Sequence, residues 1–353
     1  MRKLILICVG AVIAVIAVES LSSYVLYRYF AGADRDFYPA GSSTFTLIKH
    51  VILASQGKHM VVHLSSDRFP LFSPDEKLGY VMNPGAYNIV ENYYHQKHMF
   101  HLQVTGSGGR ATSYIPVHAT HRLFFTGDSS MFGWGLNDEE TIPWLLQSRL
   151  PNDEVVNLSL TSYSTVQALM QLTDMNPKLS TEDGVILLYH PITNDFNVAV
   201  PSLLRGLLVG YELQLGDPKE MIRMKVPLGA LDANGKLEIR RIELSCATSN
   251  ASATCARPSV DFKESMRVTE RAFDDILALH PGHVIVAFVS GADDDPVIQH
   301  LRAEGVTIAD LRLADDEPDA HEVMPTDKHA GPFWKYRVFG RLFAVLRSEG
   351  MVH

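Results

Sequence analysis

The sequence predicts an α/β fold in which a parallel sheet is doubly wound, with helices on both of its faces. Two observations predict it: short apolar runs alternate with amphipathic segments from residue 122 onward, and polar residues directly follow several of the apolar runs. Strands that alternate with helices in this way are typical of parallel sheets in a three-layer arrangement. Folds of this kind place their chemistry at the carboxyl ends of the strands.

The elements of this sheet are expected over short, well-separated ranges. The strands are expected at Leu123–Thr126, Glu154–Leu158, Gly184–Tyr189, His283–Val289 and Val306–Ala309. The helices are expected at Glu140–Leu150, Thr165–Met175, Asp261–Leu279, Asp295–Glu304 and Phe333–Arg347. A long insertion at about residues 197–258 interrupts the alternation, and such insertions usually form a cap or binding element. These ranges put the main domain at residues 121–350.

The N-terminus predicts a membrane anchor over residues 1–30. Met1-Arg2-Lys3 is basic, Leu4 to Val18 is an apolar run, and tyrosines and an arginine follow up to Phe30. About 20 mostly apolar residues cross a bilayer, and basic residues favour the cytoplasmic side. We therefore expect a single-pass protein of the inner membrane with its main domain in the periplasm or otherwise outside the cytoplasm. A cleaved signal peptide, ending at Ala31-Gly32-Ala33, is the alternative.

Residues 31–120 are expected to form a stalk and a small β-rich module. Turn-forming residues separate its four strand-like stretches, which are Met60–Leu64, Gly79–Met82, Tyr87–Val90 and His98–Val104. The histidines of this region match no metal-binding spacing, and the sequence has no glycine-rich phosphate loop, so neither a metal nor another cofactor is expected.

Charge and cysteine content narrow the class of protein further. The chain of 353 residues has a net charge of −9 and no basic stripe, which excludes a typical nucleic-acid-binding protein. Cys246 and Cys255 bracket a small polar loop, and a disulfide across it suits an exported protein. Two free cysteines or a metal site are the alternatives.

The segment Thr126-Gly127-Asp128-Ser129 follows the first predicted strand of the main domain. Glycine permits a tight turn and Asp or Ser can cap a following helix, so a helix cap is one interpretation. The other is a nucleophile whose hydroxyl points into the crevice at the end of the sheet. Three later segments favour the nucleophile: Asn157–Tyr163, Thr193-Asn194-Asp195 and Asp327-Lys328-His329.

These four segments, in this order, resemble the SGNH, or GDSL-like, hydrolase and acyltransferase superfamily over about residues 122–348. The resemblance implies a flavodoxin-like three-layer sheet and a catalytic triad. In that triad Ser129 attacks, His329 accepts its proton and Asp327 orients the histidine. It also implies an oxyanion hole made of the backbone N–H groups of Ser129 and Ser162 and the side-chain amide of Asn194.

Three positions depart from the family pattern. Ser162 replaces a glycine, although a serine disfavours a positive φ. Ile192 replaces the glycine that usually precedes the family's asparagine by two residues. The Asp-x-x-His spacing is shortened to Asp-x-His, so Thr326 takes the usual aspartate position and Asp327 is the least secure member of the triad.

The resemblance predicts a serine esterase or O-acyltransferase that acts on acyl esters, above all acetyl esters, of a carbohydrate or polysaccharide. Trp134, Tyr163 and His190 are candidates for substrate binding. Lipid esters are the alternative substrates, and a non-catalytic scaffold or binding subunit with a degenerate site is the alternative of another class. The expected partners are the ester substrate, the lipid bilayer and other envelope polysaccharide-synthesis proteins.

Overall fold

The computed structural model describes residues 63–66, 71–93, 96–114, 116, 118–119, 121–198, 225–243, 261–280, 282–312, 329 and 331–352. They belong to one compact unit, His63–His353. The predicted anchor and stalk, Asp327, Cys246 and Cys255 lie outside the described residues. Among the helices that are described, none has both the length and the apolar composition needed to span a bilayer.

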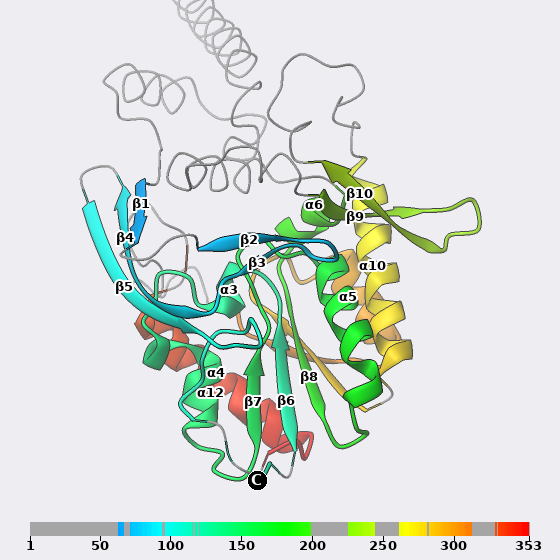
Figure 1. Ribbon diagram of the computed structural model, residues 1–353. Helices are drawn as coiled ribbons and strands as arrows, with labels where there is room; N and C mark the ends of the chain where they lie inside the picture. The colour runs from blue at the N-terminus through cyan, green and yellow to red at the C-terminus, as the bar shows by residue number, and fades with distance from the viewer. Residues whose placement is uncertain are drawn as a thin grey trace, which may run out of the picture. The chain divides into compact units, whose positions relative to one another are not determined.

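A five-stranded parallel sheet forms the centre of this unit (Figure 1). Its strand order is β12-β11-β8-β6-β7, so the chain starts in the interior of the sheet and winds outward in both directions. The predicted α/β fold with a parallel sheet is therefore confirmed. The strands are β6 (Arg122–Thr126), β7 (Glu154–Asn157), β8 (Gly184–Tyr189), β11 (His283–Phe288) and β12 (Thr307–Asp310).

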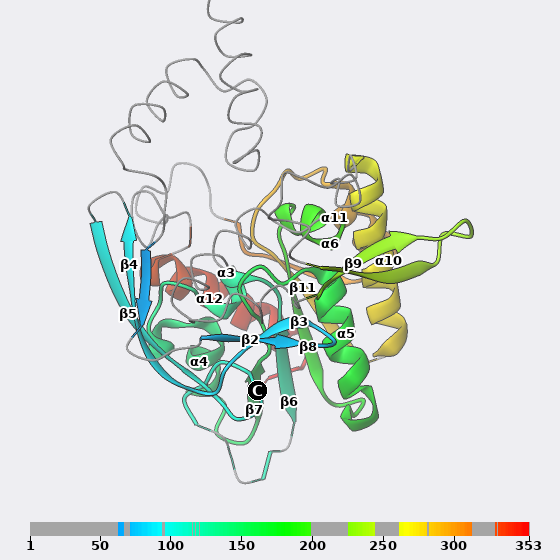
Figure 2. The ribbon, with the colours of Figure 1, turned by 45° about the horizontal axis from the view of Figure 1, so that its top comes forward.

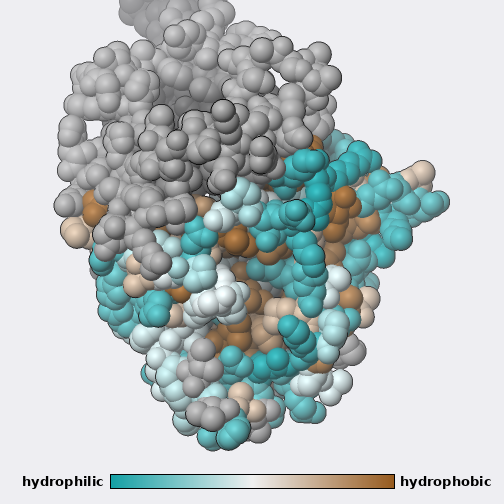
Figure 3. All heavy atoms as spheres, in the orientation of Figure 1, coloured by the Kyte–Doolittle hydropathy of each residue, from teal (hydrophilic) through white to brown (hydrophobic). Residues whose placement is uncertain are grey.

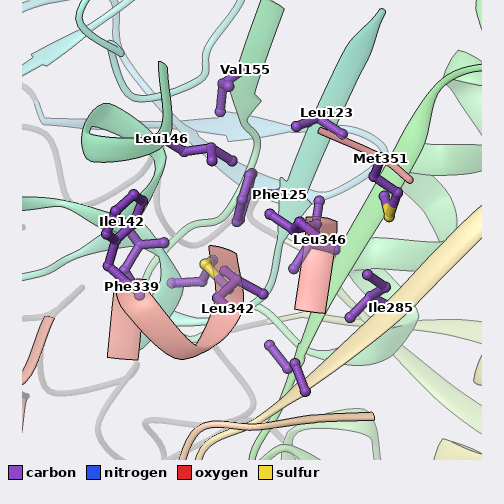
Figure 4. Close-up of a cluster of buried hydrophobic side chains, with 14 of the residues drawn as sticks. Leu123, Phe125, Ile142, Leu146, Val155, Ile285, Phe339, Leu342, Leu346 and Met351 are labelled. Carbon is purple, nitrogen blue, oxygen red and sulfur yellow. The ribbon is translucent and has the colours of Figure 1, made fainter. Parts of the chain in front are cut away.

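Helices cover both faces of the sheet because successive side chains of each strand point in opposite directions. In β8, Ile186 and Leu188 enter one apolar core, shown in part in Figure 4, whereas Val185 and Leu187 enter the other. Burying each such side chain contributes about 1.5–3 kcal/mol. The helices are α4 (Ile142–Gln147) and α12 (Pro332–Ser348) on the first face, and α5 (Thr165–Met175), α10 (Phe262–Leu279) and α11 (Pro296–Ala303) on the second.

Three helices of the second face begin at polar capping residues. Asp261 and Asp295 cap α10 and α11, and Ser164 forms a reciprocal capping box with Gln167 at the start of α5. Helix α4 is shorter than the expected Glu140–Leu150 at both ends. Glu140 belongs to a separate 3₁₀ turn, η1 (Asp138–Glu140), and the helix ends at Gln147 with Ser148 as its C-cap.

Three smaller antiparallel groups of strands accompany the central sheet (Figure 2). Two of their strands, β2 and β9, were not expected from the sequence, because each contains a proline that weakens a strand pattern. The groups are the sheet β1 (His63–Ser66), β4 (Gly85–Tyr93) and β5 (Gln96–Val104); the hairpin β2 (Phe72–Asp75) and β3 (Gly79–Met82); and the hairpin β9 (Lys225–Leu231) and β10 (Leu237–Glu243).

The hairpin β9–β10 is the described part of the predicted insertion. Leu231 and Leu237 pack against Val268 of α10 and Val166 of α5. The surface over this hairpin and α10 is mostly hydrophilic in Figure 3. The insertion is therefore anchored to the second helical layer by a small apolar cluster.

Candidate active site

The turn after β6 places Ser129 at the start of a short helix, α3 (Ser129–Phe132). Gly127 has a φ of +152°, and a Cβ there would lie 2.7 Å from Cβ of Leu188, so a side chain does not fit. The Asp128 carboxylate caps α3 by accepting a 2.8 Å hydrogen bond from the Ser130 N–H. The segment therefore contains a helix cap and also presents Ser129 at the carboxyl end of a central strand.

His329 lies against Ser129, although 200 positions separate the two residues. Its Nε2 is 2.7 Å from Oγ of Ser129, which is normal hydrogen-bond distance. A neutral imidazole nitrogen at this position can accept the hydroxyl proton. The structure therefore brings together the two residues that the sequence predicts as nucleophile and base.

Ser162 adopts the left-handed backbone conformation that glycine favours. Its φ is +61°, and among the described residues no other non-glycine has a positive φ. This conformation costs about 1–2 kcal/mol in a residue with a Cβ. Ser162 is only 5% exposed, and its backbone N–H has no acceptor within the described part of the chain. A strained residue with an unpaired, buried donor is typical of functional sites.

The loop that carries Ser162 is fastened to the nucleophile turn. The N–H of Leu160 donates to the carbonyl oxygen of Gly127 over 3.1 Å, two residues before Ser129. The Ser129 N–H belongs to the first turn of α3, where amide groups lack acceptors within their own helix. The two backbone donors predicted for the oxyanion hole therefore come from directly connected segments.

Asn194 lies in the first turn of α6 (Ile192–Val198) and is buried. Its Nδ2 donates to the hydroxyl of Tyr189 over 3.1 Å, and that hydroxyl donates to the Asp295 carboxylate at 3.1 Å and 3.2 Å. Because the hydroxyl has one proton, Asp295 directs its lone pairs toward Asn194. The Asn194 amide thereby keeps one further N–H for another acceptor.

Buried polar atoms without partners gather at this end of the sheet. Among the described side chains, six buried nitrogen or oxygen atoms make no hydrogen bond, and four of them belong to Asn157, Ser159, Thr161 and Asn194. Native proteins contain few such atoms, and those that exist need a specific explanation. Their concentration here supports a polar binding site after β7 and β8.

His190 lies beside the Ser129–His329 pair. Burial lowers its pKa, the Asp128 carboxylate opposes this effect, and a positive charge on His329 lowers the pKa further. Its Nδ1 accepts a 3.1 Å hydrogen bond from the N–H of Ile192, so the neutral ring carries its proton on Nε2. His190 is therefore available as an uncharged hydrogen-bond donor at neutral pH.

The two aromatic candidates for substrate binding are packed into the protein. Trp134 is 4% exposed and meets the ring of Phe100 edge-on at 5.4 Å. Tyr163 is 2% exposed, and its hydroxyl donates to the carbonyl oxygen of Tyr80 over 2.6 Å. Substrate binding by these rings would need exposed ring surface, which neither has in this conformation.

Arg110 stabilises the far end of α3 and was not singled out from the sequence. Its side chain is fully buried and pairs with Asp138 at 2.8 Å. The guanidinium also donates to the carbonyl oxygens of Phe132, Gly133 and Leu136 at 3.1, 2.6 and 2.6 Å. A cation is favourable at this end of a helix, where carbonyl groups lack partners. Burial lowers the pKa of Arg110 and raises that of Asp138, because desolvation outweighs their attraction.

Lys335 is a second buried cation that the sequence pattern does not reveal. It lies on α12, six positions after His329, is 2% exposed, and donates from Nζ to the carbonyl oxygen of Ser130. Burial lowers the pKa of Lys335 to about 7, and the neighbouring Asp128 carboxylate only partly offsets this effect. The lysine thus connects the helix after His329 to the turn that carries Ser129.

Replacing Lys335 by methionine is expected to remove a pH dependence of stability. The folded pKa of about 7 lies below the ordinary value of 10.5, so the unfolded chain binds more protons between these values. The free energy of unfolding of the wild type should therefore rise with pH in this window, by at most about 1.4 kcal/mol per unit. Below this pH window Lys335 is protonated in both the folded and the unfolded state, so the folded state carries the full cost of the buried charge.

Urea unfolding of the wild type and of Lys335→Met, from about pH 6 to about pH 10, measures the difference between their free energies of unfolding. If the free energies of unfolding of the two proteins differed by the same amount at every pH, this prediction would be contradicted.

Within the described ranges, no group of three or more His, Cys, Asp or Glu side chains is placed to hold a metal ion.

No protein-family model and no curated protein sequence matches this chain. Among solved structures, it is similar to a member of the lipolytic protein G-D-S-L family from Veillonella parvula DSM 2008, with 8% identity, a TM-score of 0.38, and coverage of 65% of this chain and 99% of the other. It is also similar to a catalytic mutant of an acetylxylan esterase from Geobacillus stearothermophilus, with 17% identity, a TM-score of 0.35, and coverage of 68% and 99%. Likenesses this distant say nothing about the activity of this chain.

Proposed function

We propose that this chain is a serine esterase or O-acyltransferase with Ser129 as its nucleophile. The observation that carries the proposal is the 2.7 Å contact between Oγ of Ser129 and Nε2 of His329. This pairing favours a catalytic site over a degenerate, non-catalytic one, because it gives the Ser129 hydroxyl a base that can accept its proton.

In the first half-reaction, the Ser129 oxygen attacks the acyl carbonyl carbon while its proton moves to Nε2 of His329. The carbonyl oxygen becomes an oxyanion, which accepts hydrogen bonds from the N–H groups of Ser129 and Ser162 and from Nδ2 of Asn194. Collapse of this intermediate breaks the ester bond, and the leaving alcohol takes the proton from His329. An acyl-serine remains.

In the second half-reaction, an acceptor hydroxyl donates its proton to His329 and attacks the carbonyl carbon of the acyl-serine. The bond between the acyl carbon and Oγ of Ser129 then breaks, and Ser129 takes the proton back from His329. Water as acceptor gives hydrolysis, and a sugar hydroxyl gives acyl transfer. Asp327, which follows Thr326 in the sequence, is proposed to accept a hydrogen bond from Nδ1 of His329 and to hold the ring in the required tautomer.

We further propose that the substrates are acyl esters, in particular acetyl esters, of a carbohydrate or polysaccharide in the cell envelope. The basic and apolar N-terminus supports export and attachment to the inner membrane. The main domain would then meet envelope polysaccharides and the proteins that synthesise them. The polar character of the site after β7 and β8 favours a hydroxyl-rich substrate over a long acyl chain.

Labelling of the full-length chain with a fluorophosphonate tests the nucleophile. We expect covalent labelling of the wild type, no labelling of Ser129→Ala, and labelling of Ser130→Ala, which serves as the matched control because its side chain makes no proposed catalytic contact. An unlabelled wild type, or equal labelling of Ser129→Ala, would contradict the proposal.

Acyl release then separates the substrate classes. Acetate release from an acetylated polysaccharide, with little release of fatty acid from a lysophospholipid, would support a carbohydrate esterase. Preferential cleavage of the lysophospholipid would favour the lipid alternative. Acetylation of an added oligosaccharide from p-nitrophenyl acetate, faster than hydrolysis, would identify a transferase.

A further inference from the structure

Two buried tyrosines tie the hairpin β2–β3 to the loop that carries Ser162. The Tyr80 hydroxyl donates to the carbonyl oxygen of Thr161 over 2.6 Å, and the Tyr163 hydroxyl donates to the carbonyl oxygen of Tyr80 over 2.6 Å. Their rings meet edge-on, with centroids 5.3 Å apart. These bonds bracket Ser162 on both sides, and the hairpin lies next to α5 in Figures 1 and 2.

The hydrogen bonds from Tyr80 and Tyr163 act on different parts of the backbone. The carbonyl of Thr161 and the N–H of Ser162 belong to the same peptide group, whereas the bond from Tyr163 ends on the hairpin. In a trans peptide the C=O and N–H bonds point in opposite directions. Tyr80 therefore fixes the plane of the 161–162 peptide from one side, and the Ser162 N–H points away from it on the other. A hydrogen bond to the carbonyl also polarises the peptide and strengthens its N–H as a donor.

Tyr80 is a constant donor over the working pH range. It is buried, and its burial, reinforced by the neighbouring Tyr163, raises its pKa well above the ordinary value. The left-handed conformation of Ser162 needs such support, because without it the loop could relax to a less strained backbone.

We infer that Tyr80 is a positioning residue of the oxyanion hole, which orients and polarises the 161–162 peptide so that the Ser162 N–H meets the developing oxyanion. This inference rests on the proposed function. It also assigns a catalytic purpose to the β-rich segment that precedes the main domain.

The pair Tyr80→Phe and Tyr87→Phe tests the inference, because each variant removes one tyrosine hydroxyl that donates to a backbone carbonyl oxygen. Tyr87, on β4, is buried, and its hydroxyl donates to the carbonyl oxygen of Asn83 over 2.7 Å, which has no part in the proposed oxyanion hole. With the full-length chain and p-nitrophenyl acetate, Tyr80→Phe is expected to lower kcat by about 10-fold, less than the loss of a whole oxyanion donor. KM should stay within about 2-fold, since the ground-state carbonyl depends little on this donor. Tyr87→Phe should leave kcat within about 2-fold, although both variants lose similar stability in urea.

A tetrahedral boronate provides a second readout. The inhibition constant of phenylboronic acid, which forms an adduct with Ser129, should rise in Tyr80→Phe by about the same factor as kcat falls. If Tyr80→Phe does not fold, Tyr80 is replaced by a tyrosine fluorinated ortho to its hydroxyl, which keeps the ring and donates more strongly. That change should raise kcat by up to about 2-fold at position 80 and leave it unchanged at position 87.

The outcomes distinguish this inference from the proposed function. Equal changes in kcat for the matched variants at Tyr80 and Tyr87, or no change at Tyr80, would overturn the inference alone, provided that Ser129→Ala is inactive. Activity that survives in Ser129→Ala would overturn both. A selective loss in Tyr80→Phe, matched by weaker boronate binding, would support both.

Discussion

The replacements Ser129→Ala and His329→Gln are each expected to lower kcat by about 10⁴-fold or more. Each removes one half of the 2.7 Å pair through which the hydroxyl proton leaves Ser129. Because the pair acts as a unit, the double variant should be no slower than the slower single variant, within about 3-fold. Steady-state kinetics on p-nitrophenyl acetate, with enzyme-free hydrolysis subtracted, measure all three.

His300→Gln is the matched control for the histidine replacement. His300 lies on α11 and pairs at 2.7 Å with Asp274, on the face of the sheet opposite α12. Its kcat should remain within about 2-fold of the wild type. Losses that multiply in the double variant would show that Ser129 and His329 act independently, which contradicts the proposed proton transfer.

Replacement of Arg110 by methionine is expected to lower the free energy of unfolding by about 3–5 kcal/mol. Methionine fills much of the same space but leaves the buried Asp138 carboxylate without its partner at 2.8 Å. It also removes the donor to three carbonyl groups at the end of α3. Urea unfolding followed by tryptophan fluorescence measures the loss, and the activity should fall as well because α3 carries Ser129.

Lys77→Met is the control for this prediction, because it removes an exposed ion pair. Lys77 and Asp174 lie 2.8 Å apart with side chains 62% and 49% exposed, so the change should stay within about 0.5 kcal/mol. Adding Asp138→Asn to Arg110→Met should recover part of the lost stability, because the unpaired charge is then removed. A loss of less than about 1 kcal/mol in Arg110→Met would show that the buried pair is not needed for folding.

Much of the central fold could be predicted because its signals are local. The strands of the parallel sheet are buried on both faces and therefore appear as continuous apolar runs, and β8 and α5 match their predicted ranges residue for residue. The strands β2 and β9 gave no such signal. Each contains a proline, and pairing with its partner strand in the hairpin stabilises it more than its own sequence does.

The order of the motifs along the sequence was sufficient to predict that Ser129 and His329 lie together. The residues that support this pair belong to no sequence motif, so they could not be predicted in the same way. Arg110 follows a glycine-rich turn and Lys335 lies in an amphipathic helix, where basic residues usually face solvent. The bond from Lys335 to Ser130 joins residues 205 positions apart, which no local pattern reports. Tyr80 likewise resembles an ordinary strand residue until the structure places its hydroxyl on Thr161.

The backbone of Arg110 forms isolated bridges with Val104 at the end of β5 and with Asn157 at the end of β7. Backbone pairing through Arg110 therefore connects the antiparallel strand β5 to strand β7 of the parallel sheet. A shortened chain that began at residue 121, where the sequence pattern changes, would lose this junction together with Arg110 and Tyr80. In evolutionary terms the upstream strands are therefore not a separable accessory. A gene fusion or truncation that separated them from the sheet would also remove part of the scaffold of the proposed active site.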